Sequence, residues 1–267
     1  MKTITRTLAA TVLTVFTLNS TSCQHQQKKK VAEEKNEVKA EAPDAKVKKQ
    51  QGYALPGLDH GLIQSPINIH TNQTEDTSQH SITLNYKESS ENVVNLGHTI
   101  QVNYDAGNTI SFDGRTFDFK QFHFHTPSEH LIDGMTFPLE MHMVHTLPGI
   151  KKGEDPVYLV VGILFKEGKE NPFLDEFMNA IPTEEEGENK VDGGTVNIND
   201  LKDQFTDLGY YHYQGSLTTP PYTETVTWLV IKEILEASPD QIQRFNKLEG
   251  NNARHVQAMY GRKVDGN

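Results

Sequence analysis

Residues 115–125 read RTFDFKQFHFH and form the clearest structural pattern in this chain of 267 residues. Successive side chains of a β-strand point to opposite faces of its sheet. As a strand, this stretch places Gln121, His123 and His125 on one face and the intervening phenylalanines on the other. The two imidazoles then point the same way, about 6–7 Å apart at Cα, a spacing that allows both to bind one metal ion.

A second stretch, residues 139–146 (LEMHMVHT), carries another histidine of suitable parity. As a strand it places Glu140, His142 and Val144 on one face. His142 completes a set of three histidines if the two strands pair in register. Three neutral imidazoles that leave a fourth position open are typical of a catalytic zinc site, so the expected cofactor is Zn²⁺. His145 has the opposite parity and is not expected to be a ligand.

Two polar residues are placed to support these histidines. Metal-binding histidines normally donate their second ring N–H to an acceptor, which fixes the ring orientation. Gln121 shares a face with His123, and Glu140 shares one with His142, so each is an expected acceptor. The alternative is that the histidines are packed or surface residues, because two histidines at this spacing often occur by chance. The His-Glu-x-x-His motif of helical zinc proteases does not occur in the sequence.

Alternation of apolar and polar residues dominates the rest of the chain and predicts strands. The expected strands are residues 81–86, 93–94, 99–104, 109–112, 115–125, 139–146, 157–166 and 225–234. Short helices are expected at 173–181 and at 240–248, the second preceded by Ser238 as N-cap and Pro239 at its first position. The predicted fold class is mainly β: a single domain built on a large, twisted, mostly antiparallel central sheet with a few short peripheral helices.

The N-terminal segment is predicted to be an export signal, residues 1–23. Lys2 and Arg6 give it a positive start, and the uncharged apolar run at 8–18 is too short to span a bilayer. Cys23 is the only cysteine and stands where a lipoprotein would carry its lipid anchor. Ordinary signal cleavage nearby is the alternative. The protein is therefore expected to be exported, whether periplasmic, secreted or lipid-anchored to a bacterial membrane.

Composition separates a tether from the domain. Residues 24–51 lack aromatic residues and are rich in Lys, Glu, Gln and Ala, which predicts a disordered charged tether before a domain at 52–267. Residues 1–50 hold 10 of the 25 basic and 5 of the 36 acidic residues, so 51–267 keeps 15 and 31, a net charge of −16. A domain this acidic repels nucleic acid, which is not an expected partner. Nothing in the sequence indicates the oligomeric state.

Seven short blocks occur in an order that resembles the α-class carbonic anhydrases, especially the bacterial ones. The blocks are QSPINI (64–69), GH (97–98), QFHFH (121–125), PSEH (127–130), LEMHMVH (139–145), GSLTTPP (215–221) and VTW (226–228). The resemblance covers roughly residues 51–264. It implies the α-carbonic anhydrase fold and the reversible hydration of carbon dioxide to bicarbonate and a proton, with weak ester hydrolysis as a side activity.

The resemblance also implies roles for residues at the metal. His123, His125 and His142 would bind zinc, and zinc lowers the pKa of its bound water so that hydroxide forms. Thr218 would accept a hydrogen bond from the zinc-bound hydroxide and donate its own to Glu129. A hydroxyl has one proton, so a carboxylate behind it fixes that direction. Without the family, Thr218 would be interpreted as a turn residue and Glu129 as a surface carboxylate.

The remaining implied roles concern proton transfer and substrate. His98 matches the family's proton shuttle, the alternative being an exposed strand residue. Leu96 and Gln101 stand where asparagines are common in the family, and Leu96 cannot order water. The backbone carbonyl of Asn252 would face His125. The expected pocket for carbon dioxide is lined by Val144, Val160, Leu217, Trp228 and Thr219.

Two other classes of function compete with an enzyme. Some members of the family have lost zinc ligands and act as recognition or adhesion domains, but all three histidines are present here. A zinc-storage protein would carry exposed histidine-rich tracts, whereas the 12 histidines are scattered along the chain. The enzyme remains the favoured hypothesis.

Overall fold

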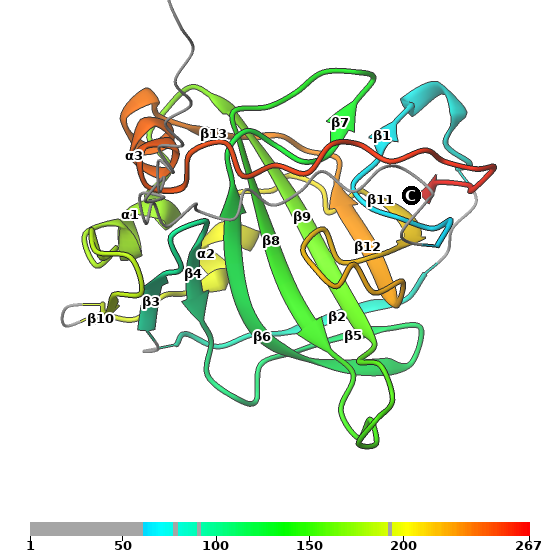
Figure 1. Cartoon of the computed structure of the whole chain (residues 1–267), viewed down its shortest axis with the longest axis horizontal. Helices are drawn as coiled ribbons and strands as arrows, with labels where there is room; N and C mark the ends of the chain where they lie inside the picture. The colour runs from blue at the N-terminus through cyan, green and yellow to red at the C-terminus, as the bar shows by residue number, and fades with distance from the viewer. Residues whose placement is uncertain (1–60, 77–79, 90–91, 192–193) are drawn as a thin grey trace, which may run out of the picture. The chain divides into compact units, whose positions relative to one another are not determined.

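The computed structural model describes residues 61–267 except 77–79, 90–91 and 192–193 (Figure 1). The expected signal segment, its Cys23 and the expected tether lie outside the described residues. No helix in the described part of the chain is both long enough and apolar enough to cross a membrane.

One twisted sheet of 12 strands organises the described residues (Figure 1). Its main path runs β10-β3-β4-β6-β8-β9-β12-β11-β14, with β13 also paired to β9 and β5 joining β2 to β6. Neighbours are antiparallel except that β9 pairs in parallel with β12 and β13. Strands β1 and β7 form a separate parallel pair. The bounds are β1 Asn68–Ile69, β2 Ile82–Asn85, β3 Asn92–Asn95, β4 Ile100–Asn103, β5 Thr109–Phe112, β6 Arg115–His125, β7 Leu131–Ile132, β8 Leu139–Thr146, β9 Tyr158–Glu167, β10 Glu188–Lys190, β11 Tyr210–Gly215, β12 Val226–Ile231, β13 Leu235–Ala237 and β14 Asp265–Gly266.

The helices are short and lie at the periphery of the sheet (Figure 1). They are η1 (Thr71–Gln73), α1 (Pro172–Met178), α2 (Ile198–Lys202) and α3 (Pro239–Glu249). Helix α3 begins with a complete capping box, in which the Ser238 hydroxyl accepts from the Gln241 backbone and the Gln241 side chain accepts from the Ser238 backbone. Such a box satisfies two backbone N–H groups that the first turn leaves unpaired.

A β-bulge in β6 lets the phenylalanines in both halves of this long strand face the same core. Phe117 and Phe119 have odd numbers and Phe122 and Phe124 even ones, yet all four are buried in the same apolar cluster. The pairing of β6 with β8 shifts register between Phe119 and Gln121, leaving Lys120 as the extra residue. One inserted residue exchanges the two faces of a strand, so the phenylalanines on both sides of the bulge reach one core.

The predicted fold class is confirmed: the structure is mainly β, with a large, mostly antiparallel sheet and few short helices. The strand expected at 225–234 is shorter than predicted: β12 ends at Ile231, the chain bends at residues 232–233, and pairing with β9 resumes beyond the expected range as β13. Strand β11 was not predicted. Its burial alternates only from Tyr211 to Gln214, because Tyr210 before this stretch is buried as well, so the apolar–polar alternation on which the prediction rested is short here. Helix α2 and the two- and three-residue strands also escaped prediction, because such short elements show no periodicity.

Candidate metal centre

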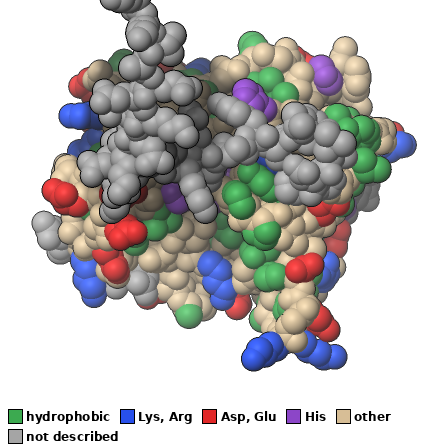
Figure 2. All heavy atoms as spheres, in the orientation of Figure 1, with side chains coloured by type: hydrophobic (Ala, Val, Ile, Leu, Met, Phe, Trp, Pro, Cys, Tyr) green, Lys and Arg blue, Asp and Glu red, His purple; other side chains and the backbone are tan. Residues whose placement is uncertain are grey.

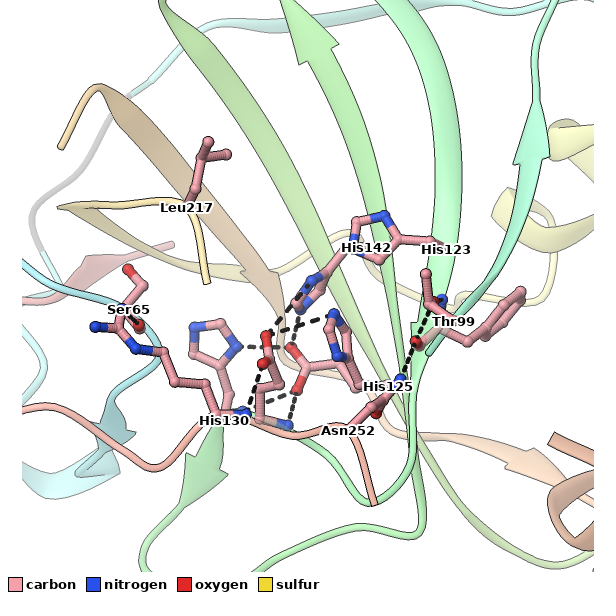
Figure 3. Close-up of polar contacts among 12 residues, drawn as sticks. Ser65, Thr99, His123, His125, His130, His142, Leu217 and Asn252 are labelled. Atoms are coloured by element: carbon pink, nitrogen blue, oxygen red, sulfur yellow. Dashed lines mark hydrogen bonds and ion pairs between the residues drawn. The ribbon is translucent and has the colours of Figure 1, made fainter. Parts of the chain in front are cut away.

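Three histidines converge on one face of the sheet, where β6 pairs with β8. His123 lies directly opposite His142, and His125 lies opposite Glu140, two residues further along β6. One ligand atom from each histidine lies within 4.8 Å of those of the other two. The ring centroids are 4.6 to 5.3 Å apart, and Figure 3 shows the three rings grouped together.

Two of the rings are oriented by acceptors on their own strands. Nδ1 of His123 lies 3.0 Å from Oε1 of Gln121. Nε2 of His142 lies 2.8 Å from Oε1 of Glu140. Since both acceptors are oxygens, these nitrogens carry the ring protons, and the lone pairs are on Nε2 of His123 and Nδ1 of His142.

His125 shows most directly that the cluster suits a metal ion. Both of its ring nitrogens are buried, and neither forms a hydrogen bond with the described residues. The Asn252 backbone carbonyl faces the ring closely enough to favour its protonation, although the contact lies outside hydrogen-bond geometry. An unpaired buried nitrogen costs about 1–3 kcal/mol. A cation held by three imidazoles would remove that cost, and this donor set fits zinc with one position left open.

Burial keeps the three imidazoles neutral. It lowers the pKa of His125 to about 4 and that of His142 below its usual value. For His123, burial together with the other two histidines lowers the pKa well below 6.5. Near neutral pH all three rings are therefore in the uncharged form that binds a metal ion.

Glu140 anchors the cluster from behind. Its side chain is fully buried, and Oε2 accepts the backbone N–H groups of Glu129 and His130, each at 2.8 Å. Oε1 lies 2.6 Å from Nδ1 of His130 and 2.8 Å from Nε2 of His142. Burial opposes ionisation, but His130 and His142 outweigh it and hold the pKa of Glu140 well below its usual value. The carboxylate is thus a buried anion with four donors around it.

The hydrogen bonds continue beyond the residues that sequence reasoning had selected. Nε2 of His130 lies 2.7 Å from the Tyr213 hydroxyl, which lies 2.9 Å from the Ser65 hydroxyl. Burial raises the pKa of Tyr213 well above 10.0, so the phenol stays neutral. His130 follows Glu129 in the PSEH block, which is the only sequence signal that pointed to it. Strand parity does not apply there because the block lies between β6 and β7.

Glu129 borders the space between the histidines. Its Oε1 accepts the Arg254 backbone N–H at 2.9 Å. Its Oε2 has no hydrogen bond and lies 3.5 Å from Nε2 of His125 and 3.8 Å from Nδ1 of His142. Burial raises the pKa of Glu129, and His142 and the Thr218 hydroxyl oppose that rise. The structure therefore brings Thr218 and Glu129 together beside the cluster.

A cavity of about 210 Å³ leads to the histidines from outside. It is lined by Leu96, His98, Thr99, Gln101, Gln121, His123, His125, Thr219 and Asn252. His98 is exposed, and its Nδ1 contacts the Leu96 carbonyl at 2.9 Å. The Asn252 side chain donates to the His98 carbonyl at 2.7 Å and to the Phe124 carbonyl at 3.1 Å. The Gln101 amide donates to Asn103 at 2.7 Å.

The residues expected to receive substrate form an apolar group on the histidine side of the sheet. Val160 lies opposite Val144 on β8 and opposite Trp228 on β12. Leu217 packs against the same cluster, and Figure 3 shows it apart from the polar contacts. The Trp228 ring lies 4.8 Å from that of His142. None of these four residues lines the cavity described above, whereas Thr219 does.

His145 lies on the opposite face of β8. Its ring stacks on Phe119 with a centroid distance of 4.7 Å. Nε2 lies 2.9 Å from the Tyr86 hydroxyl and Nδ1 lies 3.1 Å from the Leu159 carbonyl. Both nitrogens are therefore engaged away from the three-histidine cluster.

Comparison with known proteins relates the whole domain to one family. The sequence model described as "Eukaryotic-type carbonic anhydrase" matches residues 49–267. A carbonic anhydrase of Neisseria gonorrhoeae is 41% identical over 210 residues, which are 76% of this chain and 77% of that protein. A hyperthermostable carbonic anhydrase from a hydrothermal vent chimney is 39% identical, with a TM-score of 0.70, over 77% of this chain and 88% of its own. The α-carbonic anhydrase of Thermovibrio ammonificans, solved with the inhibitor sulfanilamide, is 37% identical, with a TM-score of 0.70, over 76% and 86%.

Replacing Glu140 with glutamine tests its role as a buried anion that accepts the surrounding N–H groups. The amide keeps the shape but presents an NH₂ group to N–H donors, so Glu140→Gln should lower the free energy of unfolding of the metal-free protein by about 3–5 kcal/mol near neutral pH. Because the pKa of Glu140 is lower in the folded state, its charge stabilises the fold above pH 4.5 and this contribution is lost as the pH falls below that value.

Urea denaturation at several pH values measures both effects. Glu140→Gln should lose less stability than the native protein on acidification through pH 4.5. The loss caused by the histidines below their ordinary pKa of 6.5 should remain in both proteins. Exposed Glu170→Gln, the matched control, should change stability by no more than about 0.5 kcal/mol. Equal pH dependence of all three proteins would contradict the assigned role of Glu140.

Proposed function

The chain belongs to the eukaryotic-type carbonic anhydrase family, and from this premise we propose that it hydrates carbon dioxide reversibly at a Zn²⁺ ion held by His123, His125 and His142. The observation that carries the zinc site is the convergence of these rings, with both nitrogens of His125 buried and unpaired. Bound zinc would supply a Lewis acid that lowers the pKa of a water molecule.

The protein's own side chains orient the reactants. Gln121 and Glu140 hold the rings of His123 and His142 by accepting their N–H groups. Thr218 has one hydroxyl proton, and donating it to Glu129 leaves the oxygen of Thr218 to accept from the attacking water. Fixing the direction of that water raises the rate by removing unproductive orientations.

Carbon dioxide is nonpolar and needs an apolar surface beside the polar centre. Val144, Val160, Leu217 and Trp228 supply that surface in our proposal, with Thr219 at the cavity side. The backbone N–H of Thr218 would bind an oxygen of the substrate. The same arrangement would hydrolyse activated esters weakly.

Each turnover leaves a proton that must reach the buffer. We assign its transfer to His98, which is exposed and lines the cavity together with His123 and His125. An imidazole can both accept a proton and release it, which suits it to a proton shuttle. The neighbouring Leu96 offers no side-chain donor or acceptor for water along this path, whereas Gln101 does.

Metal content and activity test the zinc site together. The purified protein should contain about one zinc ion that depends on the three histidines, and should hydrate carbon dioxide in a stopped-flow pH-indicator assay. His125→Gln should lose both properties while keeping its fold by circular dichroism, because His125 has no hydrogen bond to lose. Exposed His70→Gln should retain both. A zinc-loaded native protein without hydration above the buffer rate would refute the proposal.

The proton route is tested by buffer dependence. His98→Ala should turn over more slowly than the native protein in a weak, low-concentration buffer, because the proton acceptor in the cavity is lost. Added imidazole should restore most of the rate by carrying the proton itself. An equal loss of rate in both buffers would show that His98 has another role.

Export is a separate proposal, supported by the positive start and apolar run of residues 1–23. We expect the mature protein to begin near Cys23 and to carry a lipid on that residue. Mass spectrometry of the N-terminal peptide from the native host should show the lipid's mass. An unmodified cysteine would exclude the anchor but not export, whereas an intact Met1 would exclude both.

A further inference from the structure

A second group of metal-binding side chains lies outside the centre described above. It comprises His80, His212 and Asp265, with one ligand atom from each within 4.8 Å of the others. His80 precedes β2, and His212 on β11 lies opposite Asp265 on β14 in the antiparallel register. The C-terminal end of the chain, red in Figure 1, thus lies beside β11. His212 points away from the face of β11 that carries Tyr213, since neighbouring strand residues alternate.

We propose that His80, His212 and Asp265 bind a second divalent transition-metal ion, of which zinc is the expected one. Two imidazoles and one carboxylate are a known donor set for zinc. No role for these residues follows from carbon dioxide hydration. The site goes beyond the proposed function and does not depend on it.

Between His80 and Asp265 the distance suits a shared cation better than a direct hydrogen bond. Nε2 of His80 is buried, forms no hydrogen bond and lies 3.8 Å from Oδ2 of Asp265. That separation is too long for a hydrogen bond. Two ligands of one tetrahedral zinc ion lie about 3.3–3.5 Å apart, given bonds of about 2.0–2.2 Å, so the pair needs to close only slightly. Nδ1 of His212 forms a direct hydrogen bond of 2.8 Å with Oδ1 of Asp265, and metal binding would replace that hydrogen bond and open the pair by a similar amount.

Both rings have a partner on the nitrogen that the metal would not use. Nδ1 of His80 lies 2.6 Å from Oδ2 of Asp113, in the turn between β5 and β6, which leaves Nε2 as the ligand. Nε2 of His212 faces the Gln214 amide at 3.3 Å. Rotating that amide presents its oxygen to a ring N–H. A carboxylate or amide behind each histidine is the usual support of a protein metal site.

The charge around the cluster also suits a cation. Asp113 and Asp265 contribute two carboxylates, and among the described residues neither forms an ion pair with a lysine or arginine. The side chains of His80, His212 and Asp265 are 20%, 12% and 30% exposed, so the cluster lies near solvent and water could complete the coordination of an ion. Ligands from three separate segments make the expected role structural.

Cobalt uptake by zinc-loaded protein tests the second site without disturbing the first. Once one equivalent of zinc fills the three-histidine centre and free zinc has been removed, Co²⁺ titration should show one further equivalent bound, with visible d–d absorption from nitrogen and oxygen ligands. His80→Gln and His212→Gln should each abolish that equivalent and leave carbon dioxide hydration unchanged. Asp113→Asn should weaken the affinity about 10–100-fold, because it only orients His80. His70→Gln, the matched control, should behave as the native protein.

The outcomes separate this proposal from the proposed function. Cobalt uptake that disappears in His212→Gln supports the second site even if the protein shows no hydration activity. No further uptake by the native protein, or uptake that persists in both His80→Gln and His212→Gln, would overturn it. Thermal unfolding gives an independent measure: Co²⁺ should raise the midpoint of the zinc-loaded native protein, and not that of His212→Gln. A rise of equal size in both would also overturn the site.

Discussion

The register between β6 and β8 is the constraint on which the rest of the structure depends. It sets His123 opposite His142 and brings His125 alongside them. A slip of one residue would turn each imidazole of the slipped strand into the opposite face. The bulge at Lys120 makes this register compatible with the core, since it lets the phenylalanines before and after it pack together while the histidines face away. Bulges are common beside active sites because they redirect side chains in this manner.

Two buried glutamates behind the histidines have opposite electrostatic environments. Glu140 has four donors around its two oxygens, and His130 and His142 keep it ionised despite burial. Glu129 has one oxygen without a hydrogen bond, and burial raises its pKa. A buried carboxylate costs several kcal/mol unless donors compensate it, so the first is suited to a permanent structural anion. Glu129 keeps one oxygen without a hydrogen bond beside the histidines. That oxygen can accept a hydrogen bond from a hydroxyl such as that of Thr218. Residues of one type thus acquire different roles from their surroundings.

Strand parity predicts much of this arrangement because it depends on local geometry alone. It groups His123 with His125 and Gln121, and separates His142 from His145. Parity has no bearing on His130, which lies outside the strands, or on the contact of Tyr213 with it across the structure. Strand β11, which carries Tyr213, was not predicted because its apolar–polar alternation covers only residues 211–214. The ordered sequence blocks identified the family and hence the fold, but hydrogen-bond partners such as Ser65 and Arg254 become evident only from the tertiary structure.

The two histidine clusters lie in parts of the sheet that differ in how extensively strand pairing holds them. The β6–β8 pair lies within the sheet, with β4 and β9 as outer neighbours, so its histidines are held without any metal. Strand β14 pairs with β11 over two residues and bridges Glu75, and within the part of the chain that the structure describes β2 pairs only with β5. These outer strands have little pairing to hold them, and a cation shared by His80, His212 and Asp265 would join both to β11. In our two proposals, a metal ion at the centre of the sheet would therefore add chemistry to a frame that strand pairing already holds, whereas one at its margin would add a cross-link between strands with few pairing partners.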